Sequence, residues 1–138
     1  MLILYTQDGL PEVVSDMDKL EHVFELQHAF DTDLANRRAL DFSDRAEWVQ
    51  REIMALIVEA GELLQEVNYK WWKDPKPIDR DKILDEMADI FHFFLAACLR
   101  MGFSADELYN AYCRKNEENF RRQRGESDKH GYRSEAPR

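Results

Sequence analysis

The sequence predicts an all-α protein, an antiparallel four-helix bundle whose core is completed by dimerisation. Apolar residues recur at alternating four- and three-residue steps from Val49 to Val67, which is the spacing of a helical bundle seam. Glycine and proline are sparse and gather where helices are expected to end. A chain of 138 residues is long enough for one domain with its own core, so we expect a single domain over residues 1–138.

The first two helices are expected to begin after polar residues. Residues 1–15 are predicted to be an extended lead-in, and Ser15 to be the N-cap of a helix that runs to about Asn36. The predicted inward stripe of this helix is Leu20, Phe24, Gln27, Phe30 and Leu34. A polar turn over 41–44 precedes the second helix, which carries the seam from Val49 to Val67.

A proline-containing loop separates the second helix from the third. Pro75 and Pro77 cannot continue a helix, so Asp79 is the expected N-cap of the next one. This third helix is predicted to run to Met101, with Gly102 as its C-terminal stop.

The third helix is apolar on nearly every face from Ile90 to Leu99. One antiparallel neighbour could not bury such a surface, which predicts a central helix or a subunit interface and hence a homodimer or tetramer. Ser104 and Glu107 form the capping-box pattern of a fourth helix, which leads into a flexible polar tail over 123–138.

Composition excludes several classes of function. A net charge of −9 argues against a broad nucleic-acid-binding surface, because such affinity comes mainly from cationic contacts to phosphates. The longest apolar run, Phe93 to Leu99, is too short to cross a membrane, and no secretion-signal pattern opens the chain, so we expect a cytoplasmic protein. Cys98 and Cys113 lack the spacing of a zinc site and are interpreted as reduced packing residues.

Four acidic residues carry the strongest chemical signal. Glu59 and Glu62 are three apart on the second helix, and Glu86 and Asp89 are three apart on the third, so each pair lies on one face of its helix. Carboxylates that converge beside an apolar seam repel one another unless cations or protons neutralise them. All-oxygen ligands favour Mg²⁺, with Mn²⁺ as a possible substitute. The simpler alternative is that both pairs are solvated helix surface.

The combination of motifs resembles a known family. Glu59-x-x-Glu62, a spacer with Tyr69-Lys70-Trp71-Trp72-Lys73, and Glu86-x-x-Asp89-x-x-His92-Phe93 resemble the all-α nucleoside triphosphate pyrophosphohydrolases that include the MazG-type enzymes. The closer resemblance is to the dimeric dUTPases. Leu26-Gln27 and the fourth-helix pattern Tyr112-x-x-Lys115-Asn116-x-x-Asn119, followed by Arg122, add to it.

The resemblance implies a reaction and a metal. It implies hydrolysis of dUTP to dUMP and pyrophosphate, with Mg²⁺ held between the triphosphate and the four acids Glu59, Glu62, Glu86 and Asp89. A carboxylate within reach of the attacking water can accept its proton, and Glu62 is the first candidate, with Glu59 as the second. Both are also plausible as simple metal ligands.

The resemblance also implies substrate contacts, each with a structural alternative. Gln27 can offer an amide to the base edge or lie at the edge of the core, and Phe93 can contact the nucleoside or be core. Trp72 can stack on the base or cover a loop. His92 is a further implied contact to the nucleoside. The resemblance also implies contacts to the sugar and phosphates from Lys115, Asn119 and Arg122, and the alternative for these three is an exposed basic stripe.

Base identity and enzyme class both have rival interpretations. Many dimeric dUTPases have an asparagine shortly after the glutamine of the first helix, whereas Phe30 and Asp31 follow Gln27 here, so a pyrophosphohydrolase for dCTP or a non-standard nucleotide is the nearest alternative. Glu25-x-x-His28 and Asp89-x-x-His92 imitate a di-iron bundle, although Glu25 falls off the inward stripe. A non-catalytic helical dimerisation module is the third possibility.

Overall fold

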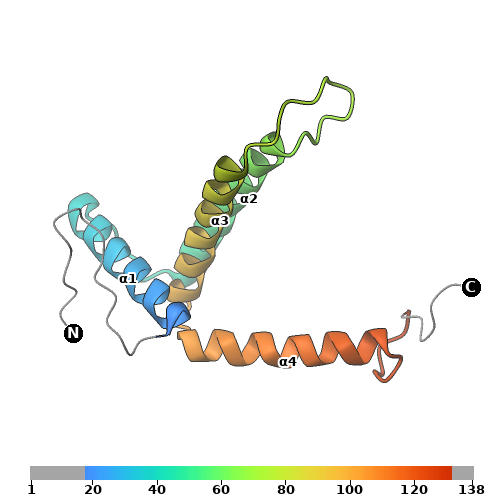
Figure 1. Ribbon diagram of the computed structural model, residues 1–138. Coiled ribbons are helices and arrows are strands. Elements are labelled where there is room, and N and C mark those ends of the chain that lie inside the picture. Colours follow the sequence, from blue (N-terminus) through green and yellow to red (C-terminus); the bar gives the residue numbers. More distant parts are fainter. Residues whose placement is uncertain (1–17, 132–138) are drawn as a thin grey trace, which may run out of the picture. The chain divides into compact units, whose positions relative to one another are not determined.

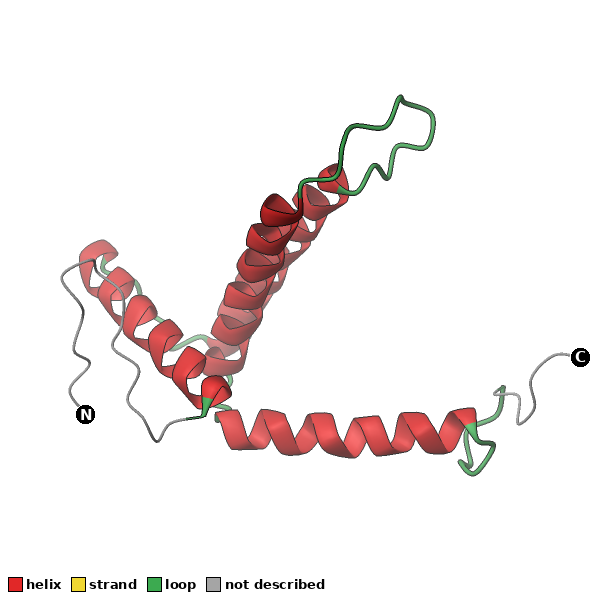
Figure 2. Cartoon of the chain, in the orientation of Figure 1, coloured by secondary structure: helices red, strands yellow, loops and turns green. Residues whose placement is uncertain are grey.

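The computed structural model describes residues 18–131, and these residues contain four helices and no strand (Figure 2). The helices are α1 (Lys19–Arg38), α2 (Arg45–Glu66), α3 (Arg80–Arg100) and α4 (Ala105–Gln123). The predicted all-α class is therefore confirmed. The lead-in expected over 1–15 lies outside the described residues.

Local capping explains where α1 begins and ends. The Asp18 carboxylate accepts hydrogen bonds from the backbone N–H groups of Leu20 (2.7 Å) and Glu21 (3.2 Å), so Asp18 is the N-cap. Ser15, the predicted cap, lies outside the described residues. The helix passes the predicted end by two residues and stops where Ala39 adopts a left-handed conformation (φ 52°).

The predicted starts of the other helices are confirmed, and α3 ends at Arg100, one residue before the predicted Met101. Asp44 and Asp79 cap α2 and α3, and Gly102 follows α3 with a φ of 77° that favours glycine. At the start of α4, the Ser104 hydroxyl accepts from the Glu107 backbone (3.1 Å), and the Glu107 carboxylate accepts from the Ser104 backbone (2.9 Å).

The chain divides into two compact units, with the boundary in the sequence between Gly102 and Phe103. In the first unit, α2 and α3 form an antiparallel hairpin and α1 packs against α3 (Figure 1). The second unit contains α4. Completion of a four-helix bundle and of its core by dimerisation stays a prediction, as does the single domain.

The core of the first unit is small and centred on α3. Its buried apolar side chains are Phe24, Leu95, Ala96, Ala97 and Cys98. Gln27 is buried as predicted, but Phe30, placed on the same inward stripe, is 60% exposed, so that part of the predicted stripe is wrong for the single chain. Many large apolar side chains of α2 and α3 remain exposed in the single chain, among them Ile57, Leu84 and Met87.

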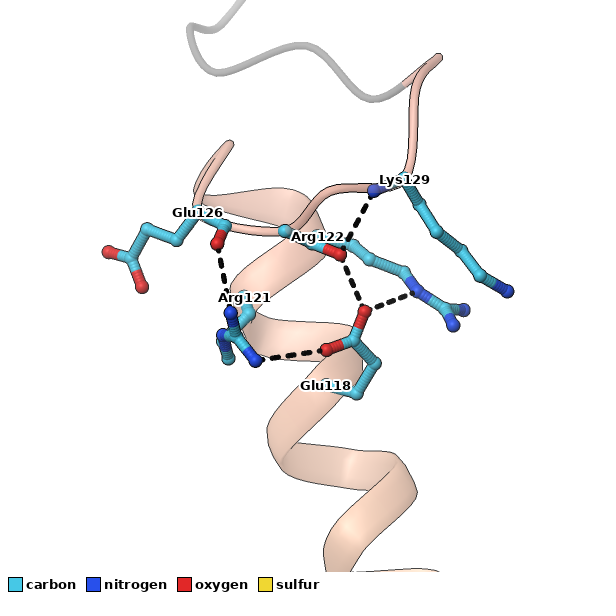
Figure 3. A network of polar contacts seen from close by, with 6 residues as sticks. Glu118, Arg121, Arg122, Glu126 and Lys129 are labelled. Atoms are coloured by element: carbon cyan, nitrogen blue, oxygen red, sulfur yellow. Dashed lines mark hydrogen bonds and ion pairs between the residues drawn. The ribbon is translucent and has the colours of Figure 1, made fainter.

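A polar network closes the C-terminal end of α4 (Figure 3). Glu118 accepts hydrogen bonds from Arg122 Nε (3.1 Å) and from the hydroxyl of Ser127 (2.6 Å), and Arg121 donates to the backbone oxygen of Glu126 (3.2 Å). These bonds tie the start of the predicted polar tail back to the helix. Residues 132–138 lie outside the described part of the chain.

Within residues 18–131, no single helix is both long enough and apolar enough to cross a membrane, and the broken pair α3 and α4 passes that test by length and composition only.

Candidate functional site

Three carboxylates converge between α2 and α3. Glu59 and Glu62 lie one turn apart on α2, and Glu86 faces them from α3, so that one oxygen of each lies within 4.8 Å of the others. We call these three residues the acid cluster. The packing of α2 against α3 brings together acids that are separated by a loop in the sequence, as the spacing predicted.

The acid cluster is electrostatically strained. Partial burial raises the pKa of Glu59, and the negative charges of Glu62, Asp89 and Glu86 raise it further. Burial and the charges of Glu62 and Asp89 likewise raise the pKa of Glu86. One oxygen of Glu86 is buried without a hydrogen-bond partner in the described residues.

The acid cluster suits a hard divalent cation. Its donors are carboxylate oxygens without histidine or cysteine, which is the ligand chemistry that Mg²⁺ and Mn²⁺ prefer. A bound cation would offset the mutual repulsion and give the buried Glu86 oxygen a partner. Asp89, the fourth predicted ligand, is outside the group of three but close enough for its charge to raise the pKa of both Glu59 and Glu86.

Glu66 extends the acidic face of α2 and was not predicted as a site residue. Its charge contributes to the raised pKa of Glu86, and its carboxylate pairs with Lys76 Nζ of the following loop at 3.1 Å. The spacing from Glu59 through Glu62 to Glu66 places all three on one helical face, so a longer periodicity search would have found it.

A cavity of about 450 Å³ adjoins the acid cluster and has the size of a small-molecule site. Glu59 belongs to both, since it lines the cavity as well as the cluster. The cavity-lining residues are Gln27, Phe30, Asp31, Leu34, Leu40, Phe42, Trp48, Glu52, Glu59, Asp89, His92, Phe93 and Ala96. The predicted contacts Gln27, His92 and Phe93 are therefore brought together.

Both polar atoms of the Gln27 side-chain amide have hydrogen-bond partners at the cavity wall. Its Nε2 donates to Asp31 Oδ1 at 2.9 Å, and its Oε1 lies 2.9 Å from His92 Nδ1. Gln27 and Asp31 are each only 6% exposed. The helix spacing of four residues between them makes the first bond local to α1, whereas the second joins α1 to α3.

A buried ion network includes Asp31 and Glu52, which both line the cavity. Arg100 forms an ion pair with Asp31 and lies 3.5 Å from Glu52, and its guanidinium covers the Phe42 ring at 3.6 Å from the centroid. Burial raises the pKa of Asp31 and of Glu52, and in both residues the charge of Arg100 opposes that effect. None of these three charged residues was predicted from the sequence as a site residue. The signal was an arginine ending the apolar run of the third helix.

The tryptophan assigned to base stacking does not line the cavity. Trp72 lies on the loop after α2, is 59% exposed, and meets the Trp71 ring edge-on at a centroid distance of 5.7 Å. The tryptophan that does line the cavity is Trp48, in the first turn of α2, which was not predicted. Asn68 fixes the base of the loop by exchanging two side-chain hydrogen bonds with the backbone of Lys76 (2.8 and 2.9 Å).

The remaining predicted contacts lie on α4 in the second unit. Lys115, Asn119 and Arg122 recur at four- and three-residue steps and so share one side of that helix. Arg122 pairs with Glu118 there. Their role toward a substrate stays a prediction.

Comparison with known proteins agrees with this arrangement. A family model described as dUTPase matches residues 19–101, which span α1, α2 and α3 and hold both the acid cluster and the cavity. The chain belongs to the dUTPase family. This all-α family is the one that the motifs resembled, although the match ends before the fourth-helix motif.

Two phage proteins are similar to this dUTPase-family chain over part of its length. A dCTP pyrophosphatase of Enterobacteria phage LZ5 is 41% identical over 58 residues, covering 42% of this chain and 34% of that protein. A dCTP pyrophosphatase of Enterobacteria phage T4 is 31% identical over 87 residues, covering 53% of this chain and 51% of that protein. The alignments thus span about a third to a half of these relatives, and no solved structure matches the chain.

Proposed function

We propose that this protein is a Mg²⁺-dependent nucleoside triphosphate pyrophosphohydrolase that converts a pyrimidine deoxynucleoside triphosphate into its monophosphate and pyrophosphate, with dCTP preferred over dUTP. The observation that carries the proposal is that the acid cluster and the cavity share one residue. Glu59 belongs to a carboxylate cluster suited to a divalent cation and lines a cavity of ligand size. A nucleotide has both parts that such a site needs, a base and a polyphosphate.

The residues of the site divide the chemistry between them. The acid cluster and Asp89 would hold Mg²⁺, which when bound neutralises phosphate charge and lowers the pKa of water. Glu62 is exposed at the edge of the cluster and is our first candidate to accept the proton of the attacking water, with Glu59 as the second. The apolar walls of the cavity, including Phe93 and Trp48, exclude water around the base.

Two candidate bases remain, each with its own support. The curated relatives are named dCTP pyrophosphatases, which favours cytosine. The family description is dUTPase, which supports dUTP as the second candidate. The sequence-based expectation gave dUTP first, and the relatives favour the alternative that it left open.

The testing experiment measures pyrophosphate and monophosphate release from dCTP, dUTP, dTTP and UTP, with Mg²⁺, with Mn²⁺ and with EDTA. We expect metal-dependent release that is fastest with dCTP and lost in Glu62→Gln. Glu117→Gln, which changes an exposed acid of α4, is the matched control and should keep the wild-type rate.

Other outcomes would contradict the proposal. Metal-independent turnover would remove the acid cluster from the mechanism, and purification with bound iron would favour the di-iron alternative. The cluster itself contains no histidine, and His92 is engaged with Gln27. No turnover of any nucleotide, together with no Mg²⁺ binding by calorimetry, would favour a non-catalytic helical module.

We further propose that the protein acts in the cytoplasm as a homodimer or tetramer. The support for assembly is the large apolar area that α2 and α3 leave exposed in the single chain, which a second copy would cover. Lys115, Asn119 and Arg122 of α4 are proposed to contribute to binding of the sugar and phosphates.

A further inference from the structure

Gln27 is the polar group best placed to distinguish bases, because it is buried in the cavity wall and carries both a donor and an acceptor. A side-chain amide presents an N–H group in one orientation and a C=O group in the other. Whatever fixes the orientation of this amide therefore fixes which hydrogen-bonding edge it can recognise.

Asp31 fixes it. An ionised carboxylate only accepts hydrogen bonds, so the NH₂ group of Gln27 must face Asp31 Oδ1, as the 2.9 Å contact shows. On its other oxygen Asp31 pairs with Arg100, whose charge opposes the rise in the pKa of Asp31 caused by burial and so favours the ionised acceptor. The carbonyl oxygen of Gln27 then faces His92 Nδ1, which must carry a proton to donate to it. In the neutral form of the ring, His92 Nε2 is then an acceptor.

Cytosine and uracil differ in this respect. Cytosine has an acceptor at N3 and a donor amino group at C4, whereas uracil has a donor at N3 and an acceptor oxygen at C4. For a base held in one position, an amide can match both edges only by turning over. The other ionisable groups that line the cavity are the His92 ring and four carboxylates, all able to accept a hydrogen bond from an amino group. The carboxylates are those of Asp31, Glu52, Glu59 and Asp89.

We infer that Asp31 is a specificity-determining positioning residue, which locks the Gln27 amide in one orientation, so that the amide can match only one of the two base edges; under the proposed function this is the edge of cytosine. The inference rests on the proposed function for its substrate class. It adds a residue that touches Gln27 and Arg100 rather than the reacting phosphates.

The first variant that tests the lock is Asp31→Asn. Asparagine has nearly the same size, but its side chain can offer either an oxygen or an NH₂ group, so Gln27 can turn over. In competition assays we expect the ratio of kcat/KM for dCTP to that for dUTP to fall by about tenfold or more, the scale on which a mismatched hydrogen bond discriminates substrates. Because both substrates compete for the same folded molecules, this ratio is independent of the folded fraction.

A second measurement requires no turnover. In ¹⁵N NMR spectra of the imidazole, wild-type His92 should carry its proton on Nδ1, and Asp31→Asn should give a mixture of tautomers. Asp33→Asn is the matched control, since Asp33 lies two residues along α1, is exposed, and pairs with Arg37 at the surface. It should leave both the ratio and the tautomer unchanged.

The outcomes separate this inference from the proposed function. If wild type hydrolyses no nucleotide, the proposed function fails while the His92 tautomer still tests the lock. If wild type prefers dCTP and Asp31→Asn keeps the same ratio and the same tautomer, the lock is wrong and the function stands. A wild-type preference for dUTP overturns the assignment to cytosine.

Discussion

Glu62 belongs to the acid cluster, where repulsion among the carboxylates opposes folding and favours the binding of a cation. Its negative charge raises the pKa of both Glu59 and Glu86. We expect Glu62→Gln to melt at the same or a higher temperature than wild type in EDTA, because one repelling charge is removed. The rise in Tm that Mg²⁺ gives to wild type should be absent in the variant.

Thermal unfolding followed by circular dichroism, with Mg²⁺ and with EDTA, measures both effects. Glu117→Gln is again the control, and it should keep the Mg²⁺-dependent rise. A variant that is less stable than wild type in EDTA yet still stabilised by Mg²⁺ would show that Glu62 is a packing residue and not a ligand.

The pH dependence at Glu59 has a definite sign. Its pKa is raised above the ordinary value of 4.5, so the folded state holds the proton more tightly than the unfolded state. Stability from this group is then fully present below that ordinary pKa and is lost as the pH rises through the folded-state value. In EDTA, Glu59→Gln should therefore exceed wild type in stability by an amount that grows as the pH rises above about 4.5.

Urea unfolding of both proteins at several pH values measures that difference. In saturating Mg²⁺ the stability advantage of Glu59→Gln should disappear or reverse, since only wild type keeps the Glu59 carboxylate as a ligand for the metal. A difference that is the same at every pH would contradict the electrostatic origin of the raised pKa.

At the level of the elements, one arginine connects all three helices of the first unit. Arg100 of α3 pairs with Asp31 of α1 and Glu52 of α2, and the three side chains are 7%, 8% and 13% exposed. We expect Arg100→Met to lower the free energy of unfolding by about 3–5 kcal/mol, because two buried carboxylates lose their cation. Chemical denaturation at neutral pH measures the change.

Arg51→Met is the matched control on α2. Arg51 pairs with Glu47, but the two side chains are 55% and 52% exposed, and such surface pairs contribute about 0–1 kcal/mol. Similar losses in the two variants would mean that the buried network contributes no more than a surface pair. A loss in Arg100→Met that is recovered at low pH would support the buried carboxylates as its cause.

At the level of the whole molecule, exposed apolar area predicts self-association. Leu84 and Met87 on α3 are 62% and 52% exposed in the single chain. We expect wild type to sediment as a dimer or tetramer, and Leu84→Glu to shift it toward monomer because a charge cannot be buried in that face without a partner. Lys82→Glu, at an exposed position of the same helix, is the control and should keep the assembly.

Analytical ultracentrifugation at micromolar concentration gives the mass, and circular dichroism verifies that the helices persist. A monomeric wild type would contradict the dimer expectation and leave the exposed faces of α2 and α3 unexplained. A monomeric but active Leu84→Glu would show that one copy holds the complete site.

Local patterns in the sequence determined most of the elements. Asp44, Asp79 and the Ser104 capping box fixed where helices begin, because capping depends on residues within one turn. Helical periodicity likewise predicted that Glu59, Glu62 and Glu86 would meet, since each set lies on one face of its helix. The same rules named Gln27 as a polar position within an apolar stripe.

The tertiary structure alone decided which side chains share the cavity. Asp31, Glu52 and Arg100 come from three helices, and nothing in their local sequence states that they will meet. Trp48 lines the cavity, whereas Trp72, on the loop after α2, does not. The path of the chain between the helices decides which tryptophan ring faces the cavity. Helix formation depends on neighbours in sequence, whereas this cavity depends on contacts between residues up to 69 positions apart, which only packing can select.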